Sequence, residues 1–391
     1  MKLTGFYLTL RVIKHKIKAQ NTAWRTRMKK LLVLLSVVLV VFGLTACAKT
    51  EEPTPEVPTG YEIALVTDIG TIDDKSFNQG AWEGVVAYAE ENSLTYQYYK
   101  PAAATDVDYV AAITEAVDAG AKVVVTPGYM FAPAIYEAQD LFPEVSFILL
   151  DADPHTADYA TFRIEKNVYS VYYAEEQSGF LAGYAAVKDG YTELGFMGGM
   201  AVPAVVRFGY GFVQGADYAA NELGVDVNVT YKYLNSFAPD TAWATEAKSW
   251  YSEGTEVIFV AAGGAGLSVM AGADEVGGKV IGVDVDQSNL SASVLTSATK
   301  GLTSSVYAAL TDFYAGSFKG GVVETLDVAK NGVGLPADFS RFTTFTQADY
   351  DTIFAALVAD TNGVTTSIKK DADVAAVTEL ALVKTTVTVL E

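Results

Sequence analysis

The loop that follows the first apolar run of the chain carries the side chains best suited to bind a small molecule. Residues Ile63 to Val66 are apolar throughout, which is typical of a strand buried on both faces of a parallel sheet, and a helical pattern starts at Asn78. The loop between these segments holds polar side chains and one aromatic: Asp68, Asp73, Asp74, Lys75, Ser76 and Phe77. Open α/β sheets bind ligands at the carboxyl ends of their strands, so this composition favours a binding loop. The alternative is an ordinary βα loop, with Asp73 or Ser76 capping the helix and Phe77 as a hydrophobic staple.

Polar or glycine residues also follow other strand-like runs. They are Pro127-Gly128-Tyr129, Asp151, Gly263, Gly264, Gly266, Asp284 and Asp286. Carboxylates gathered at one edge of a sheet repel one another unless a partner donates hydrogen bonds, so we expect a donor-rich ligand. Each position also has a structural interpretation. Asp68 is suited to cap a turn or helix, Asp151 to start a turn before Pro154, and the glycines to form a tight strand-to-helix turn.

Enzyme and metal chemistry find little support in the sequence. Apart from His15 and His155 there is no histidine, Cys47 is the single cysteine, and the HExxH, GxSxG and Walker motifs are absent. The acidic run DIGTIDD lacks the spacing and the glycine of an EF-hand loop. We therefore expect a binding protein that is not an enzyme and that needs neither a metal nor a cofactor.

Length and charge narrow the class further. A chain of 391 residues exceeds what one hydrophobic core usually serves, so two lobes are expected. Its formal net charge of −20 disfavours nucleic acid and anionic lipid as partners, because both require clustered Lys and Arg. No basic helix-turn-helix precedes the first lobe, which argues against a transcription regulator. The ligand is expected to be neutral or cationic.

Residues 28–46 are expected to be a bacterial lipoprotein signal peptide that ends before Cys47. Lys29 and Lys30 form its charged start, Leu31 to Phe42 its apolar region, and Leu44-Thr45-Ala46-Cys47 its lipobox. The apolar run is shorter than the ~20 residues that a transmembrane anchor needs. The Cys47 thiol would accept the lipid, and residues 47–60 would tether the folded part to the membrane. Residues 1–27 contain seven Lys or Arg and no acidic residue. We interpret them as a misannotated leader upstream of a start at Met28.

From Tyr61 onward, strand-like and helix-like segments alternate. Strands are expected at Ile63–Val66, Tyr96–Tyr99, Lys122–Thr126, Ser146–Leu150, Leu194–Met197, Val227–Leu234, Val257–Ala261 and Val280–Val283. Helices are expected at Asn78–Glu91, Tyr169–Val187, Ala204–Leu223, Ala242–Tyr251, Leu267–Val276 and Asp349–Val358. This order indicates an α/β protein with parallel sheets, and periodicity alone leaves open whether there is one sheet or two. The tail from Asp338 ends in the β-rich KTTVTVLE.

Several segments together resemble the basic membrane protein family, the purine-nucleoside-receptor-like substrate-binding lipoproteins of ABC transporters. They are TDIGTIDDKSFNQGAWEG, QSGFLAGYAA, LGFMGG, RFGYGFVQGADYA, AAGGAG, IGVDVDQ and VLTSATKG, which occur in the family's order between roughly Tyr61 and Leu335. The resemblance implies a type I periplasmic-binding-protein fold, in which two Rossmann-like lobes joined by a multi-strand hinge enclose the ligand cleft. Residues 61–165 plus about 293–330 would form the N-terminal lobe, and 166–292 plus part of 331–391 the C-terminal lobe and hinge. Crossovers are expected near Arg163–Asn167, near Asp284–Ser293 and around Gly332–Arg341.

The resemblance also implies roles for individual residues. Asp68 and Asp151 match positions that meet the base of a nucleoside, and Phe77 matches the residue that stacks on it. Asp284 and Lys300 match positions that hold the ribose, and Gly263 and Gly264 the loop that lets the backbone approach the sugar. Asn78, at the start of the helix, is included among the expected ligand-binding residues.

One departure from the family concerns the second aromatic wall around the base. Ala262 stands directly before Gly263-Gly264, where another member carries an aromatic residue. Phe237 is the candidate for the missing wall, whereas Phe259 is better interpreted as strand core. Arg207 and Phe208 are interpreted as structural or interlobe residues.

The sequence thus predicts a monomeric lipoprotein, anchored through Cys47 on the extracytoplasmic face of the cell membrane. It would capture a nucleoside, with purine favoured, by lobe closure and deliver it to the permease of an ABC importer. Two alternatives stay open. One is a binding lipoprotein for a sugar or another small polar solute, and the other is an adhesin or signalling lipoprotein with a vestigial cleft.

Overall fold

A computed structural model describes residues 60–391 of the chain. The expected leader, the signal peptide, Cys47 and all of the expected tether except Gly60 lie outside these residues. Within the described part of the chain, no helix has both the length and the apolar character needed to cross a membrane.

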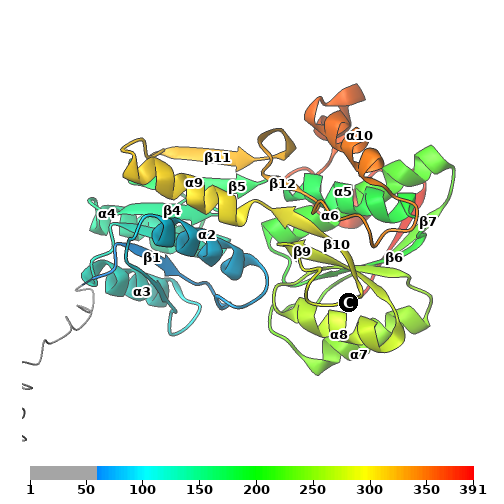
Figure 1. Ribbon diagram of the computed structural model, residues 1–391, viewed down its shortest axis with the longest axis horizontal. Coiled ribbons are helices and arrows are strands. Elements are labelled where there is room, and N and C mark those ends of the chain that lie inside the picture. The colour runs from blue at the N-terminus through cyan, green and yellow to red at the C-terminus, as the bar shows by residue number, and fades with distance from the viewer. Residues whose placement is uncertain (1–59) are drawn as a thin grey trace, which may run out of the picture. The chain divides into compact units, whose positions relative to one another are not determined.

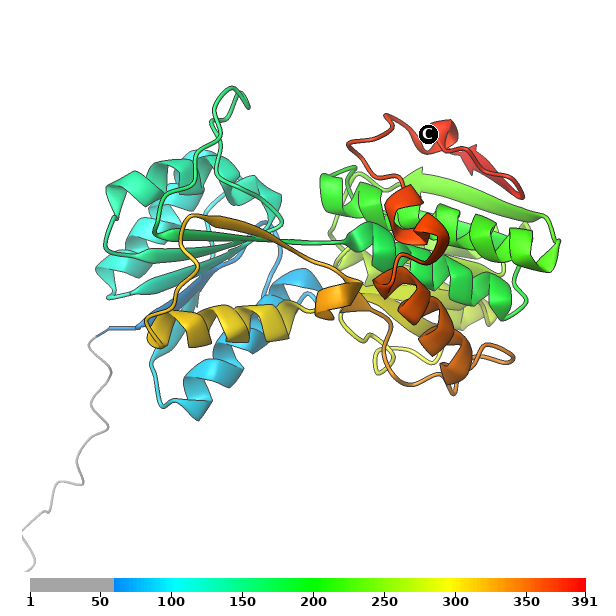
Figure 2. The same cartoon turned by 90° about the horizontal axis from the view of Figure 1, so that it is seen from above.

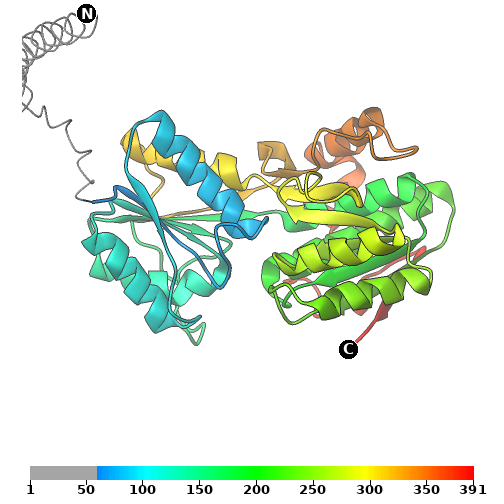
Figure 3. The same cartoon turned by 60° about the horizontal axis from the view of Figure 1, so that its bottom comes forward.

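The first lobe is built on a six-stranded parallel sheet with strand order β11-β5-β4-β3-β1-β2. Its strands are β1 (Ile63–Val66), β2 (Tyr96–Tyr99), β3 (Val123–Pro127), β4 (Ser146–Leu150), β5 (Val168–Tyr173) and β11 (Val322–Leu326). Helices α2 (Phe77–Glu91) and α9 (Leu302–Tyr314) cover one face of the sheet, and α3 (Asp106–Asp118) and α4 (Ala132–Leu141) cover the other (Figure 3). Because both faces are covered, alternate residues of β1 enter different cores: Ile63 and Leu65 face α2, and Ala64 and Val66 face α3.

The second lobe has seven strands in the order β12-β10-β9-β8-β6-β7-β13 (Figure 1). The strands are β6 (Glu193–Gly198), β7 (Val227–Tyr233), β8 (Val257–Ala261), β9 (Lys279–Asp284), β10 (Val294–Lys300), β12 (Val333–Gly334) and β13 (Thr385–Val389). Only β12 runs antiparallel to its neighbour. Helices α5 (Glu175–Lys188) and α6 (Pro203–Leu223) pack on one face, and α7 (Thr241–Ser252) and α8 (Ala265–Val276) on the other. The expected α/β fold with two parallel sheets is confirmed.

The chain passes between the two sheets three times. It crosses from β5 into α5, from β10 into α9, and from β11 to β12, and Figure 2 shows β5 in green and β11 in orange at the junction of the lobes. The first two crossovers thus come later in the chain than the expected positions near Arg163–Asn167 and Asp284–Ser293, and the third begins before the expected Gly332. The helix expected at Tyr169–Val187 is wrong in its first part, because Val168–Tyr173 form β5. All residues of β5 except Ser170 are valine or tyrosine, which favour a strand, and no turn residue separates the strand from α5.

Helices α5 and α6 lie unusually close together, which explains the glycines of their sequences. A Cβ atom on Gly183 would lie 2.0 Å from the carbonyl oxygen of Phe212, and one on Gly215 would lie 1.9 Å from that of Phe180. No side chain fits at either position. The close contact buries nearly all of α5 and fixes the amino-terminal ends of both helices relative to each other.

The C-terminal segment packs on the second lobe. Helix α10 (Gln347–Val358) confirms the predicted helix, which begins two residues earlier because Thr346 and Asp349 form a reciprocal capping box. The short helix α11 (Val364–Ser367) follows, and β13 then pairs in parallel with the edge strand β7. Asp217 of α6 accepts hydrogen bonds from the backbone N–H groups of Val383 and Lys384, which aligns β13.

Candidate functional site

A cavity of about 680 Å³ lies where the carboxyl ends of the two sheets meet. Every residue expected to bind ligand lines this cavity: Asp68, Phe77, Asn78 and Asp151 from the first lobe, and Phe237, Gly263, Gly264, Asp284 and Lys300 from the second. Residues that are far apart in the sequence therefore line the same cavity. Their roles toward a ligand remain predictions.

Asp68 follows β1 and is held by the first turn of α2. Its Oδ1 accepts hydrogen bonds from the Gly70 N–H at 2.7 Å and from Asn78 Nδ2 at 2.9 Å. Asn78 Nδ2 also donates to Asp74 at 2.9 Å, and Asn78 Oδ1 accepts from the Asp68 N–H at 3.2 Å. Both amide hydrogens of Asn78 are thus used within the protein, so this residue orients Asp68. Burial raises the pKa of Asp68 to about 6, although the hydrogen bonds from Gly70 and Asn78 oppose the shift.

Asp68 keeps one oxygen for another partner. Its Oδ2 accepts no hydrogen bond from the described residues and lies beside Gly128, where an added Cβ would come within 3.2 Å of it. Gly128 has φ +126°, a conformation that favours glycine for a second, independent reason. The glycine therefore leaves room at the free oxygen of Asp68.

Asp151 and Asp284 occupy corresponding positions in the two lobes. Asp151 directly follows β4 and Asp284 ends β9, and both adopt left-handed backbone conformations, with φ of 62° and 67°. Such conformations are uncommon for residues other than glycine and cluster at functional sites. Asp284 Oδ2 accepts a hydrogen bond of 2.5 Å from Ser76 Oγ, which joins the two lobes. Burial raises the pKa of Asp284.

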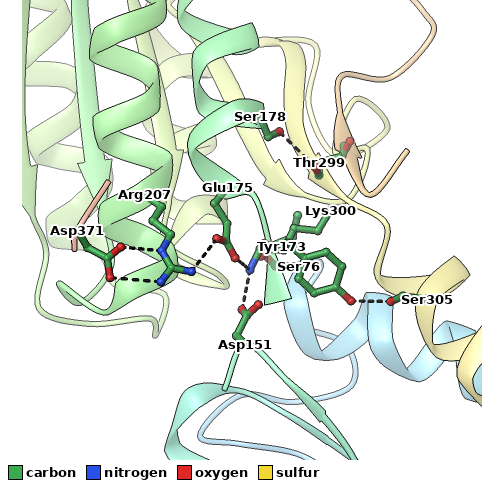
Figure 4. Close-up of polar contacts among 11 residues, drawn as sticks. Ser76, Asp151, Tyr173, Glu175, Ser178, Arg207, Thr299, Lys300, Ser305 and Asp371 are labelled. Carbon is green, nitrogen blue, oxygen red and sulfur yellow. Dashed lines mark hydrogen bonds and ion pairs between the residues drawn. The ribbon is translucent and has the colours of Figure 1, made fainter. Parts of the chain in front are cut away.

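Asp151 forms an ion pair with Lys300. Lys300 Nζ lies 2.6 Å from Asp151 Oδ2 and 2.9 Å from Glu175 Oε1 (Figure 4). The other carboxylate oxygen of Asp151, Oδ1, is buried and accepts no hydrogen bond from the described residues. Burial raises the pKa of Asp151 to about 7; Lys300 counteracts this shift and Glu175 adds to it. An unsatisfied buried acceptor at a cavity wall is a candidate contact for a ligand donor.

Lys300 is the one lysine among the residues that line the cavity, and its positive charge is compensated by ion pairs with Asp151 and Glu175. Its side chain is 2% exposed. Its Nζ also lies 4.7 Å from the ring centroid of Phe77, 5.3 Å from Tyr173 and 5.4 Å from Phe208. Burial disfavours the charge of Lys300, but Asp151, Glu175 and Asp284 together raise its pKa above the usual range. The ammonium therefore stays charged and acts as a fixed centre between the lobes.

A second layer of charges behind Lys300 was not predicted from the sequence. Glu175, the first residue of α5, is 1% exposed and lies with Oε2 3.6 Å from Arg207 Nη1. Arg207 in turn pairs with Asp371 at 2.7 Å. Arg207 is interpreted from sequence as structural, which agrees with these contacts, whereas Phe208 lines the cavity. A signal for Glu175 was present in the sequence, because two consecutive glutamates open a helix that is mostly apolar.

Aromatic rings come from both lobes. Phe77 is half-buried in the first lobe. Phe237 lies against the glycine loop of the second lobe, because a Cβ on Gly263 would be 3.6 Å from its ring and one on Gly199 would be 2.3 Å away. Phe259 is fully buried in the strand core, as predicted. Other lining residues were not anticipated as cavity walls, among them Met130, Met200 and Leu267.

Across residues 60–391, no group of three or more His, Cys, Asp and Glu side chains is arranged to hold a metal ion. The chemistry of the cavity is that of recognition. It presents carboxylate acceptors with free oxygens, aromatic faces and one compensated cation.

Residues 62–354 match the family model described as ABC transporter substrate-binding protein PnrA-like. The chain belongs to this family. It is 30% identical to the ABC transporter nucleoside-binding protein BmpA of Lactococcus lactis subsp. cremoris, over 80% of this chain and 92% of the relative. It is also 30% identical to basic membrane protein B of Borreliella burgdorferi, over 77% of this chain and 89% of the relative. The predicted family is thus confirmed. Membership in this family makes the chain a substrate-binding protein of an ABC transporter, which works with a permease and is not an enzyme.

Solved structures agree on the fold of this PnrA-like chain. An ABC transporter solute-binding protein from Aeropyrum pernix K1 superimposes with a TM-score of 0.64 at 23% identity, over 77% of this chain and 80% of that one. The Lac repressor bound to ONPG gives a TM-score of 0.50 at 13% identity, over 72% and 82%. These similarities establish the type I periplasmic-binding-protein fold.

Proposed function

We propose that this PnrA-like protein binds a nucleoside, with purine favoured, by closing its lobes on it, and delivers it to the permease of an ABC importer. The observation that carries the proposal is the combination of carboxylates and aromatic rings that line the cavity. Three carboxylates come from both lobes and line a space flanked by Phe77 and Phe237: the partly buried Asp68 and Asp151 and the buried Asp284. The name of the Lactococcus relative, a nucleoside-binding protein, supports the same ligand class.

A nucleoside supplies what these groups lack. Carboxylates accept hydrogen bonds only, and the N–H edge of a base and the hydroxyls of a ribose are donors. We assign the base to the free oxygens of Asp68 and Asp151 and the ribose to Asp284, with the backbone of Gly263 and Gly264 beside the sugar. Phe77 and Phe237 would then enclose the flat base, since aromatic rings stack on bases with favourable energy.

The charge of the cavity favours a nucleoside over a nucleotide. Lys300 is the one lysine among the lining residues, and its charge is already shared by Asp151 and Glu175. A phosphate would instead lie among carboxylates, without a free cation to compensate its charge. We therefore expect an intact nucleoside to bind more tightly than the corresponding nucleotide.

Calorimetric titration of residues 60–391 with inosine, guanosine, adenine, ribose, galactose and inosine monophosphate tests this function. Tight binding of a nucleoside, with weaker binding of its separate parts and of the nucleotide, is the expected result. Preferred binding of a sugar would instead establish the alternative solute class. If no compound binds, the vestigial-cleft alternative gains support.

Asp284→Asn separates the sugar contact from the base contact. Asparagine tolerates the left-handed backbone at this position better than alanine, so the variant removes charge without adding backbone strain. A hydrogen bond to a charged group contributes about 1.5–3 kcal/mol, which corresponds to tenfold or more in nucleoside affinity. Binding of the free base should change far less. Equal losses for nucleoside and base would contradict the assignment of Asp284 to the ribose.

A further inference from the structure

The C-terminal segment places one carboxylate in the polar network behind the cavity. Asp371 lies beyond residue 354, where the match to the family model ends, and it accepts from Arg207 Nε at 2.7 Å and Nη2 at 3.4 Å. The neighbouring backbone is fixed to the same helix, α6. Gln214 donates to the Lys369 carbonyl and accepts from the Lys369 N–H, both at 2.8 Å. The segment thus delivers Asp371 to Arg207 in a defined position.

This contact determines where the third nitrogen of Arg207 points. The guanidinium is planar, so a carboxylate that holds Nε and Nη2 also fixes the direction of Nη1. Nη1 lies 3.6 Å from Glu175 Oε2, an ion-pair distance that is too long for a hydrogen bond. Arg207 is therefore bound closely to Asp371 and only loosely to Glu175.

Glu175 depends on two cations for its compensation. Its side chain is 1% exposed, and neither carboxylate oxygen accepts a hydrogen bond of good geometry from the described residues. Lys300 Nζ lies 2.9 Å from Oε1, and Arg207 is the second cation nearby. The position of Glu175 is consequently set by the balance between the attraction of Lys300 and that of Arg207.

We propose that Asp371 is a positioning residue for the ligand cavity: by retaining Arg207, it leaves Glu175 to hold Lys300 in place. The charges alternate along a line from Asp371 through Arg207, Glu175 and Lys300 to Asp151, and Figure 4 shows these side chains in contact. The last two members line the cavity. The C-terminal segment thereby controls a ligand contact in which it takes no direct part.

Loss of the charge at Asp371 would redistribute the network in one direction. Arg207, largely buried, would turn to Glu175 as its nearest remaining carboxylate and draw it away from Lys300. Lys300 would then keep Asp151 as its one described carboxylate within 4 Å and pull that carboxylate toward itself. The ligand-facing oxygen of Asp151 would move out of position, so ligand affinity would fall.

The affinity test uses inosine and therefore rests on the proposed function. Mutations along a coupled network change ligand affinity by roughly two- to thirtyfold, and we expect Asp371→Asn to weaken binding about fivefold. Asp371→Glu, which keeps the carboxylate, should bind almost as wild type does. Asp373→Asn is the matched control, because it removes the same charge from the same segment, but within residues 60–391 the Asp373 carboxylate accepts a hydrogen bond only from the Lys370 N–H. Unchanged affinity in Asp371→Asn, or an equal loss in Asp373→Asn, would overturn the proposal.

The route through Glu175 has its own test. In a Glu175→Gln background, Asp371→Asn should cause no further loss of inosine affinity, because the carboxylate that transmits the effect is gone. A further loss of the same size as in wild type would show that Asp371 does not act through Glu175.

A ligand-free measurement separates this proposal from the proposed function. Asp371→Asn and Glu175→Gln each leave Arg207 one carboxylate within 4 Å, whereas the double variant leaves it none at that distance among the described residues and only the more distant Glu176. The double variant should therefore lower the unfolding midpoint by more than the sum of the single losses. Additive losses would overturn the coupling whatever the ligand is. If wild type binds no nucleoside, the proposed function fails, but this thermal cycle still decides the coupling.

Discussion

Phe77 could serve as a ligand contact or as part of the start of helix α2, and one substitution distinguishes these two roles. Its ring lines the cavity and has Lys300 Nζ 4.7 Å from its centroid, yet it is also the first residue of α2. If the ring stacks on a base, Phe77→Ala removes about 1–3 kcal/mol of binding free energy. The ring is only half-buried and packs against the core cluster without belonging to it, so we expect the ligand-free melting temperature to change little. Calorimetry with inosine and melting without ligand measure the two effects.

Phe162→Ala is a suitable control for this substitution. Phe162 is 55% exposed and does not line the cavity, so its loss should change neither affinity nor melting temperature appreciably. A lower melting temperature with full affinity in Phe77→Ala would show that Phe77 acts as a helix staple. That outcome would favour a sugar ligand over a nucleoside.

Three buried carboxyl groups give the protein an unusual dependence on pH. Burial raises the pKa of Asp68 to about 6, and the pKa values of Asp151 and Glu176 to about 7. Because these values lie above those of the unfolded chain, the folded state binds more protons between about pH 4 and pH 7. The associated stability is present at the acidic end of this range and is lost as pH rises through 6 to 7. Ligand affinity should change in the opposite sense, since ionised Asp68 and Asp151 accept hydrogen bonds from the ligand.

Melting curves and calorimetry between pH 5 and pH 8 check both trends. The ligand-free melting temperature should fall across this range while nucleoside affinity rises. Glu176→Gln should reduce the fall in melting temperature without changing the affinity trend, because Glu176 does not line the cavity. A melting temperature that rises steadily from pH 5 to pH 8 would refute the sign of the argument.

Single residues also show which features of the site a local sequence pattern can predict. Asp68, Asp151 and Asp284 were predicted to lie at the ligand site because each follows a recognisable apolar run, and the structure places all three in the lining of one cavity. The ion pairs of Glu175 and Asp371 could not be predicted in the same way. They join segments that are distant in sequence, and no local periodicity records such a pairing.

At the level of secondary structure, the α5 and α6 pair is the rigid support of the charged network. Gly215→Ala would place a Cβ 1.9 Å from the Phe180 carbonyl oxygen, so the helices would have to separate. Overpacking of this kind typically costs about 1–3 kcal/mol of folding free energy. We expect a clear drop in melting temperature. Ligand affinity should also weaken, because Glu175 and Arg207 lie at the amino-terminal parts of these two helices.

Gly266→Ala provides the matched control. Gly266 also lies in a helix, α8, but an added Cβ would meet Val260 at an ordinary distance of 3.6 Å. Alanine favours a helix over glycine by up to about 1 kcal/mol, so this variant should be as stable as wild type or slightly more so. Equal melting temperatures for Gly215→Ala and wild type would show that the two helices yield easily at their contact.

Element boundaries were predicted well where a turn or cap marks them. Strands β1, β2, β4 and β8 have the bounds that apolar runs indicated. The boundary between β5 and α5 was missed because Ala174 alone separates the strand from the helix. The crossover there is so short that the sequence changes period without a loop, which is also why the first crossover was expected too early.

For the whole molecule, attachment to the membrane is a proposal that depends on Cys47, which lies outside the described residues. A thiolate at the end of a lipobox is the nucleophile that takes the lipid. Cys47→Ser should therefore abolish palmitate labelling in cells and leave a larger, unprocessed precursor on immunoblots. Deletion of residues 1–27 is the companion variant, and it should leave mature mass and labelling unaltered. Unchanged labelling of Cys47→Ser would exclude lipidation at this residue.

Three crossovers join the lobes, an arrangement that suits the hinge closure we propose. One hydrophobic core cluster also runs from the α2 and α9 face of the first sheet to the α5 and α6 face of the second, so the lobes would stay joined during that motion. Asp68 and Phe77 lie on one lobe, and Phe237 and Asp284 on the other. A ligand that contacts both pairs must favour the conformation that brings them together.

Lobe closure should be visible in solution. Saturating inosine is expected to reduce the radius of gyration of residues 60–391 in small-angle X-ray scattering. At a ligand concentration of 100 times Kd it should also add about 2.7 kcal/mol to the free energy of unfolding. Asp284→Asn, which lacks one of the contacts between ligand and second lobe, should need tenfold or more inosine for the same contraction. Stabilisation without any contraction would mean that the ligand enters a preformed cavity, and a contraction in ribose alone would assign the closing contacts to the sugar.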